Sequence, residues 1–245
     1  MGSPGDGPGV VVCVVGARPN YMKMAPLLRA FQDRSDLPRS VLVHTGQHYD
    51  PMMNDRLFAD LRLPRPDINL EVGSATHAVQ TAEIMRRFES VLDELRPVCV
   101  VVVGDINSTL ACGLVAAKKW VPVAHVEAGL RSFDRSMPEE INRVVTDQLS
   151  SLLYTTEKSA HANLAREGIP AERIAFVGNV MIDSLLSHRE RAVPAEATFA
   201  RMQWRRAPGP FGVVTLHRPS NVDQPQVLGE CLEILCEVAQ RLPLV

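Results

Sequence analysis

The sequence predicts an α/β fold with a doubly wound parallel sheet, and two features of the chain support this prediction. From Val10 onward, short runs rich in β-branched residues alternate with longer segments of helical apolar spacing, a pattern typical of βαβ units. The run Val98–Val103 is apolar at every position, and Cys99 is its only residue other than valine. A strand without a polar face is expected at the centre of a sheet that helices cover on both sides.

The elements of the first part of the chain follow from this alternation. Strands are predicted at Val10–Val15, Val41–Thr45, Val98–Val103, Val121–Val126, Leu152–Tyr154 and Ile174–Phe176. Helices are predicted at Met22–Gln32, Thr76–Leu95, in the stretch that ends at Lys118, at Pro138–Leu149 and at Asn179–Arg191.

Changes in composition indicate how the chain is divided. We expect a disordered, Gly- and Pro-rich lead-in at 1–9, an N-terminal domain at 10–180, a connecting helix and linker at 181–210, and the start of a second domain at 211–245. In this second domain, a strand is predicted at Gly212–Leu216 and a helix at Pro225–Arg241. One strand and one helix bury too little apolar surface to be stable alone, so the second domain is expected to be only partly present.

The bulk composition excludes several classes of protein. With 46% hydrophobic and 22% charged residues, the 245-residue chain has the composition of an ordinary globular protein. A net charge of -2 argues against nucleic acid as the main partner. The five cysteines are odd in number and show no CxxC spacing, which predicts reduced core residues. The opening residues lack the features of a signal peptide or membrane helix, so we expect a cytoplasmic protein and no membrane partner.

Polar residues that directly follow a strand are the first candidates for a binding site, because open parallel sheets bind ligands at the carboxyl ends of their strands. The first such segment is Gly16-Ala17-Arg18-Pro19. Glycine allows a tight turn, the next helix offers free N–H groups, and Arg18 adds donors suited to phosphate. Lys23 lies about one turn further along. The alternative is a plain strand-to-helix turn with a solvated arginine.

Two further segments of this kind follow the second and third predicted strands. Thr45-Gly46-Gln47-His48 contains His48, which is a ligand contact, a proton donor or a loop histidine. Gly104-Asp105-Ile106-Asn107 follows the valine run, so Asp105 is expected at the rim of the sheet, where a carboxylate can act as an acid or base. The alternative is that Asp105 or Asn107 caps the following helix.

The segment with the most ionisable groups lies between His125 and Arg143. If Glu139 and Arg143 are both helical, their spacing of four allows them to pair on one face. A more specific hypothesis brings Glu127 and Glu139 together in a cleft, where burial and like charge separate their pKa values and leave one acid and one base.

The last segment, Thr215–Asp223, contains His217, Arg218 and Asn221. His217 and Arg218 are predicted to face an interdomain cleft if the second domain has the same fold, and to form a polar loop otherwise. None of the segments has metal-ligand spacing, a GxGxxG fingerprint, a P-loop or a nucleophile elbow. A metal or nicotinamide enzyme is therefore disfavoured, and no cofactor is predicted.

Taken in order, the strings GARPNYMKMAPL, TGQH, VVVGDINST, HVEAGLRS, PEEINR, VGNVMID and TLHRPSNVD resemble the signature series of the non-hydrolysing UDP-N-acetylglucosamine 2-epimerases. The resemblance implies two Rossmann-like domains flanking a cleft, the GT-B-like architecture of many glycosyltransferases. It also implies a homodimer that interconverts UDP-GlcNAc and UDP-ManNAc without a redox cofactor.

The resemblance also implies roles for individual residues. The family expels UDP by anti elimination to give 2-acetamidoglucal and then adds UDP back after protonation on the other face. By motif position, the catalytic residues are Asp105, Glu127, Glu139 and His217, and the substrate-binding residues are Arg18, Lys23, His48, Arg143, Arg218 and Asn221.

The chain departs from the family pattern in two respects. Asn20 and Ala17 stand where many members carry Glu and Thr, and members continue well beyond residue 245, with uridine contacts in that further part. The alternatives are a hydrolysing epimerase, a diacetamido-sugar epimerase, another GT-B relative, and a truncated UDP-sugar-binding module without catalytic activity.

Overall fold

The computed structural model describes residues 9–46, 61, 63–203, 209–217 and 219–245. The chain forms two compact units, Met1–Glu190 and Arg191–Val245. No helix in the described part of the chain is long and apolar enough to cross a membrane.

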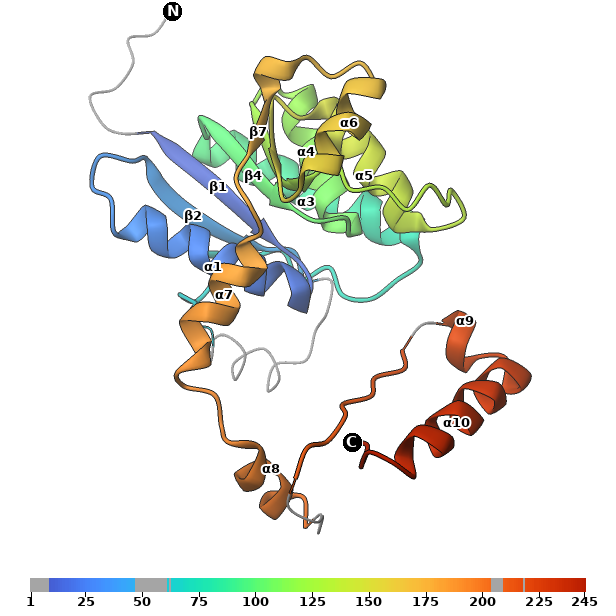
Figure 1. Ribbon diagram of the computed structural model, residues 1–245. Coiled ribbons are helices and arrows are strands. Elements are labelled where there is room, and N and C mark those ends of the chain that lie inside the picture. The colour runs from blue at the N-terminus through green and yellow to red at the C-terminus, as the bar shows by residue number, and fades with distance from the viewer. Residues whose placement is uncertain (1–8, 47–60, 62, 204–208, 218) are drawn as a thin grey trace, which may run out of the picture. The chain divides into compact units, whose positions relative to one another are not determined.

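The first unit is built on one parallel sheet with the strand order β3-β2-β1-β4-β5-β6-β7 (Figure 1). Its strands are β1 (Val10–Val15), β2 (Arg39–His44), β3 (Ile68–Asn69), β4 (Cys99–Val103), β5 (Val123–Ala128), β6 (Leu152–Thr155) and β7 (Ile174–Phe176). The valine-rich strand β4 lies in the middle of this order. The α/β fold and the central position of this strand are therefore confirmed.

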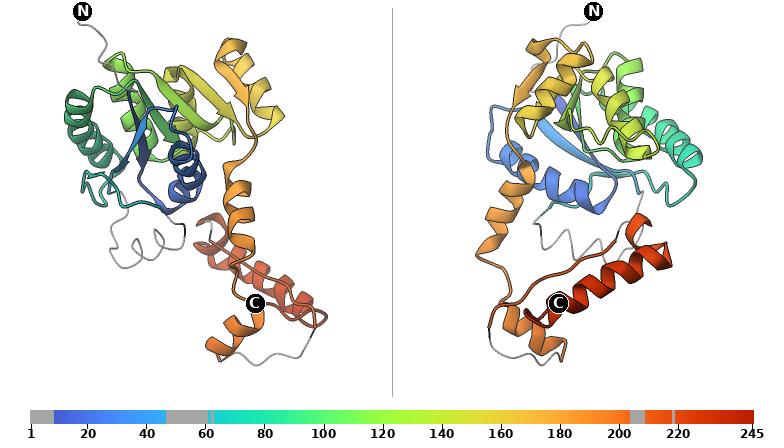
Figure 2. Two further views of the ribbon diagram at one scale, coloured as in Figure 1. Left: turned by 90° about the vertical axis from the view of Figure 1, so that its left-hand side faces the viewer. Right: turned by 45° about the vertical axis from the view of Figure 1, so that its right-hand side comes forward.

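Helices cover both faces of the sheet, so the sheet is doubly wound as predicted (Figure 2). The helices of this unit are α1 (Arg18–Gln32), α3 (His77–Leu95), α4 (Asn107–Lys118), α5 (Pro138–Leu149), α6 (Lys158–Arg166) and α7 (Val180–Arg189), with a 3-10 turn, η1, at Ala171–Arg173. Alternate valines of β4 face opposite ways: Val100 and Val102 pack with α3 and α4, whereas Val101 and Val103 pack with α1. A strand with two buried faces needs apolar residues at every position.

Helix α7, which the sequence places in the connection between domains, is part of the first unit. It packs along α1, where Val180 joins the same apolar cluster as Met24 and the Ser184 hydroxyl donates to the Met22 carbonyl oxygen at 2.5 Å.

The second unit contains α8 (Ala195–Arg201), α9 (Pro219–Val222) and α10 (Pro225–Ala239). The predicted strand Gly212–Leu216 is wrong in its extent: only Gly212 is paired, in an isolated parallel bridge with Leu244. The Val214 N–H extends this pairing with a hydrogen bond to the Val245 carbonyl oxygen at 2.7 Å. Two parallel segments joined through α10 have the connectivity of one βαβ unit.

All five cysteines are free thiols. Cys13 and Cys112 are core residues, as predicted, whereas Cys236 is exposed on α10 and does not fit that prediction. The reason is the lack of a covering layer on this helix, which has no buried residue within the described part of the chain.

Candidate active site at the carboxyl ends of the central strands

The turn between β1 and α1 is a tight connection that only glycine fits. A Cβ at Gly16 would lie 2.6 Å from the Thr45 hydroxyl oxygen. The side chain of Asn20 stabilises the turn through two hydrogen bonds. Its Oδ1 accepts from the Ala17 N–H at 3.2 Å, and its Nδ2 donates to the Val103 carbonyl oxygen at 3.0 Å. Asn20, noted above as a departure from the family pattern, thus links the first turn of α1 to the end of β4.

Arg18 opens helix α1 directly after this turn and is exposed. Its guanidinium has no ion-pair partner among the described residues. Pro19 has no N–H group, and the N–H groups of Ala17 and Asn20 are hydrogen-bonded within the turn, so the anion-binding chemistry of this helix start lies in the Arg18 guanidinium and the positive end of the helix dipole.

Lys23 lies on the same helix and forms an ion pair with Glu127 of β5. The Lys23 ammonium donates to Glu127 Oε1 at 2.5 Å, and the two side chains are 11% and 12% exposed. Gly104, the residue after β4, lies against this pair, and a Cβ there would lie 3.1 Å from Lys23 Nζ. The hypothesis of a carboxylate pair gains no support here, because the partner observed for Glu127 is a cation.

A β-bulge sets the direction of the Glu127 side chain. The pairing between β5 and β6 shifts register between Val126 and Ala128, which leaves the intervening glutamate outside the ladder. Its backbone has φ +71, a left-handed conformation that costs a residue with a side chain about 1–3 kcal/mol and that is concentrated at functional sites.

A second ion pair includes Asp105, a residue of the same turn. Asp105, the next residue after Gly104, accepts a hydrogen bond from the Arg143 guanidinium of α5, and the two side chains are 21% and 18% exposed. The Asn142 side chain also donates to the Asp105 carbonyl oxygen at 2.8 Å. Two carboxylate–cation pairs therefore lie at the Gly104–Asp105 turn.

The expected pairing of Glu139 with Arg143 is wrong. Arg143 pairs instead with Glu140, at 3.1 Å and a spacing of three. Glu140 is buried because its carboxylate accepts from the N–H groups of Ser132 and Phe133 at 2.9 and 3.0 Å. Burial alone would raise the pKa of Glu140, but the backbone donors of Ser132 and Phe133 and the Arg143 guanidinium hold it below its usual value. Glu139 is only half-buried.

The capping alternative for the third segment is also wrong. Ile106 is the N-cap residue of α4, and no side chain caps this helix. Asn107 is buried, and its Nδ2 donates to Gln80 Oε1 of α3 at 2.8 Å. Asp105 is therefore free of a capping role, and its carboxylate points to Arg143.

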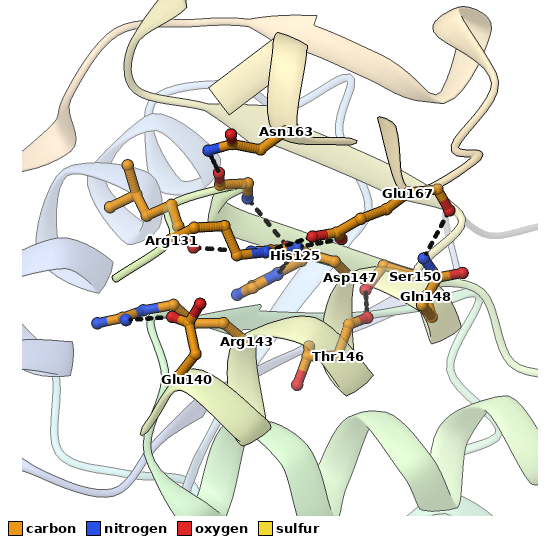
Figure 3. A network of polar contacts seen from close by, with 12 residues as sticks. His125, Arg131, Glu140, Arg143, Thr146, Asp147, Gln148, Ser150, Asn163 and Glu167 are labelled. Atoms are coloured by element: carbon orange, nitrogen blue, oxygen red, sulfur yellow. Dashed lines mark hydrogen bonds and ion pairs between the residues drawn. The ribbon is translucent and has the colours of Figure 1, made fainter. Parts of the chain in front are cut away.

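A buried polar network that the sequence analysis missed lies behind the bulge (Figure 3). Its centre is Asp147 of α5, which contacts His125 Nδ1 at 2.7 Å and the Arg131 guanidinium at 2.7 Å. Arg131 continues to Glu167 at 2.6 Å. Burial raises the pKa of Asp147, but the charges and hydrogen bonds of His125 and Arg131 outweigh this and hold it below its usual value. An available signal was His125 itself, a titratable residue inside a strand with two buried faces.

The remaining candidates belong to the second segment and to the second unit. His48 and Arg218 lie outside the described residues. His217 is exposed and Asn221 is half-buried on α9. Within the described part of the chain, no group of three potential metal ligands is found.

Comparison with known proteins identifies relatives along almost the whole chain. A family model described as UDP-N-acetylglucosamine 2-epimerase matches residues 29–245. The UDP-N-acetylglucosamine 2-epimerase of Methanocaldococcus jannaschii is 41% identical over 227 residues, which cover 93% of this chain and 62% of that protein. The UDP-2,3-diacetamido-2,3-dideoxy-D-glucuronate 2-epimerase of Pseudomonas aeruginosa is 39% identical over 230 residues, which cover 93% of this chain and 63% of that protein.

Solved structures agree with these sequence relatives. The crystal structure of the M. jannaschii UDP-GlcNAc 2-epimerase in complex with UDP-GlcNAc and UDP superposes with a TM-score of 0.84 at 39% identity, covering 96% of this chain and 64% of that chain. The Neisseria meningitidis UDP-GlcNAc 2-epimerase bound to UDP-GlcNAc gives a TM-score of 0.83 at 28% identity, covering 96% of this chain and 66% of that chain. The chain thus spans less than two thirds of the length of these relatives.

Proposed function

Because the chain belongs to the UDP-N-acetylglucosamine 2-epimerase family, we propose that it binds UDP-GlcNAc and converts it reversibly to UDP-ManNAc. The reaction is an anti elimination of UDP to 2-acetamidoglucal, followed by re-addition of UDP after protonation on the other face of C2. No redox cofactor takes part. We further propose that the protein acts as a cytoplasmic homodimer.

The observation that carries this proposal is the pair of carboxylate–cation contacts at the Gly104–Asp105 turn. Elimination at C2 needs a carboxylate that removes a proton, an acid that returns one, and cations that stabilise the charge on departing UDP. We assign the acid–base roles to Asp105, Glu127 and Glu139. Lys23 and Arg143 orient the first two and stabilise negative charge that develops next to them.

The diphosphate needs donors of its own. Arg18 is an exposed cation at the start of α1, where the helix dipole also favours an anion, and we assign it to the phosphate groups. His217 has a catalytic role in the proposal, and His48, Arg218 and Asn221 contribute further substrate contacts.

A second candidate is an epimerase for a UDP-diacetamido sugar. The observation that favours it is the P. aeruginosa relative, whose substrate carries two acetamido groups and whose identity to this chain, 39%, is close to the 41% of the M. jannaschii enzyme. A hydrolysing epimerase and a UDP-sugar-binding module without catalysis complete the set of candidates.

Deuterium exchange distinguishes these candidates. The chain is incubated with UDP-GlcNAc or with the UDP-diacetamido sugar in D2O, and NMR follows deuterium at C2, the epimer and free UDP. The proposal expects C2 deuterium and UDP-ManNAc from UDP-GlcNAc. Free N-acetylmannosamine would indicate a hydrolysing enzyme, and calorimetric binding of UDP without exchange would indicate a binding module.

The role of Asp105 is tested by Asp105→Asn. Loss of a general acid or base lowers kcat by about 100-fold or more. The matched control is Asp93→Asn, an exposed carboxylate on α3 whose partner is Lys119 at 2.7 Å, and it should retain wild-type turnover. Undiminished turnover in Asp105→Asn would exclude the assigned role.

A further inference from the structure

The β-bulge that carries Glu127 is held from behind by a single carboxylate. Asp147 accepts from His125 Nδ1 at 2.7 Å, two residues before Glu127, and from the Gly129 N–H at 3.0 Å, two residues after it. It also contacts the Arg131 guanidinium at 2.7 Å. A carboxylate that binds both sides of a bulge fixes the backbone path between them, and therefore the direction of the side chain at its centre.

The same network reaches the turn that carries Asp105. His125 Nε2 lies 2.8 Å from the Gly104 carbonyl oxygen, and the Gly104 N–H donates to the Val126 carbonyl oxygen at 3.1 Å. Gly104 is thus held through both of its backbone polar groups by residues of β5. Because Asp105 follows directly, its carboxylate is placed by the same contacts.

The donors and acceptors determine the charge of His125. A carbonyl oxygen only accepts, so Nε2 carries a proton. Asp147 Oδ2 also accepts from the Gly129 N–H and contacts the Arg131 guanidinium, and this cation favours the ionised carboxylate, to which Nδ1 then donates a second proton. The ring, fully buried between Asp147 and the Gly104 carbonyl oxygen, thus has the hydrogen-bond partners of an imidazolium.

We propose that Asp147 is a positioning residue for the reaction, which acts through His125 and Gly129 to hold Glu127 and the Gly104–Asp105 turn in their working geometry. This inference rests on the proposed function for its kinetic consequences, but the charge of His125 is independent of it. Buried ion pairs of this kind contribute little net stability compared with apolar packing. Because the network connects the backbone segments of both proposed acid–base carboxylates, we attribute to it a role in positioning them rather than in stability alone.

The test compares Asp147→Asn with Glu167→Gln. The first substitution replaces one acceptor oxygen of Asp147 by an amide donor. That amide faces the donors of His125 or of Gly129 and Arg131, so one of the hydrogen bonds that hold the bulge is lost. Glu167 belongs to the same network but contacts neither the bulge nor Gly104, and its side chain is 27% exposed. Misplacing a reacting group by about 1 Å costs about 100-fold in rate, so kcat should fall about 100-fold in the first variant and stay near wild type in the second.

A double mutant separates positioning from general loss of structure. If Asp147 acts partly through Glu127, then Asp147→Asn combined with Glu127→Gln loses less activity than the product of the two separate losses, because the effects of groups that act as a unit are not additive. Multiplying losses, or equal kcat in Asp147→Asn and Glu167→Gln, would overturn the inference. If Asp147→Asn does not fold, His125→Gln provides the same comparison, since it retains a donor to Gly104 and removes the donor to Asp147.

Histidine-ring NMR of the wild-type chain tests the network without turnover. The proposal expects two protonated nitrogens with the 15N shifts of an imidazolium for His125, and a neutral ring would overturn it. A wild-type chain that shows this imidazolium but no C2 exchange would contradict the proposed function, and with it the catalytic purpose of the network, while the charge assignment stands.

Discussion

Replacement of Gly104 by alanine tests whether the turn at the two ion pairs is shaped for the proposed chemistry. Gly104 has φ +69, and a Cβ there would lie 3.1 Å from Lys23 Nζ and 3.5 Å from Asn20 Nδ2. The backbone conformation alone costs alanine about 1–2 kcal/mol. For a chain of this size each kcal/mol lowers Tm by about 2–4 °C, so the expected decrease is about 2–8 °C.

The matched control for this variant is Gly168→Ala. Gly168 has φ +79, and a Cβ there would meet no atom within 4 Å, so it carries the same backbone cost without a contact in the site. Both variants should therefore show a similar decrease in Tm by calorimetry. Only Gly104→Ala should lose C2 exchange or UDP binding, because its methyl group displaces Lys23 from Glu127. Equal activity losses in the two variants, or wild-type activity in Gly104→Ala, would refute the reasoning.

Two other predictions concern stability and thiol chemistry. The depressed pKa of Glu140 means that its contribution to the free energy of unfolding is present above the usual glutamate pKa and is lost as pH falls through the folded value. Glu140→Gln should therefore cost about 1–3 kcal/mol at pH 7 and less in acid, as followed by urea unfolding at several pH values; a loss that does not change with pH would contradict this. Cys236 is exposed, whereas Cys13 and Cys112 are buried, and burial raises the pKa of Cys13 to about 12. The folded chain should thus show a fast thiol reaction that Cys236→Ala reduces, and reaction of Cys13 or Cys112 only on unfolding; fast labelling of either buried thiol would contradict the core assignment.

The central part of the fold was predictable because its signal is local. The run of valines in β4 requires apolar neighbours on both faces, and that fixes its place in the sheet. The two-residue strand β3 (Ile68–Asn69) has no such signal, since two residues cannot show a period. The predicted strand Gly212–Leu216 had a suitable pattern, but only Gly212 is paired as a bridge, because pairing depends on a partner segment that a local pattern does not specify.

The candidate site was predictable in location but not in pairing. Strand ends correctly indicated where Asp105 and Glu127 would lie, because parallel strands bring their carboxyl ends to one edge. Helical spacing allows Arg143 to meet an acid either three or four residues earlier. The choice of Glu140 over Glu139 depends on the N–H groups of Ser132 and Phe133, which bind the Glu140 carboxylate. No local rule contains that contact.

One regularity connects the missed features. Two residues with side chains adopt a left-handed backbone conformation from the end of β5 to the start of α5, Glu127 with φ +71 and Phe133 with φ +59. A buried carboxylate of α5 binds the backbone at or near each of them. Asp147 accepts from the N–H of Gly129, two residues after Glu127, and Glu140 accepts from the N–H of Phe133 itself. These two acids are seven residues apart, which is about two helical turns and places them on one face. Buried acids at this spacing are costly unless donors meet them, and an irregular connection with free N–H groups supplies such donors. The N–H groups of the connection therefore satisfy the buried acids of α5, and these acids in turn hold the left-handed backbone. The direction of the Glu127 side chain follows from this mutual arrangement.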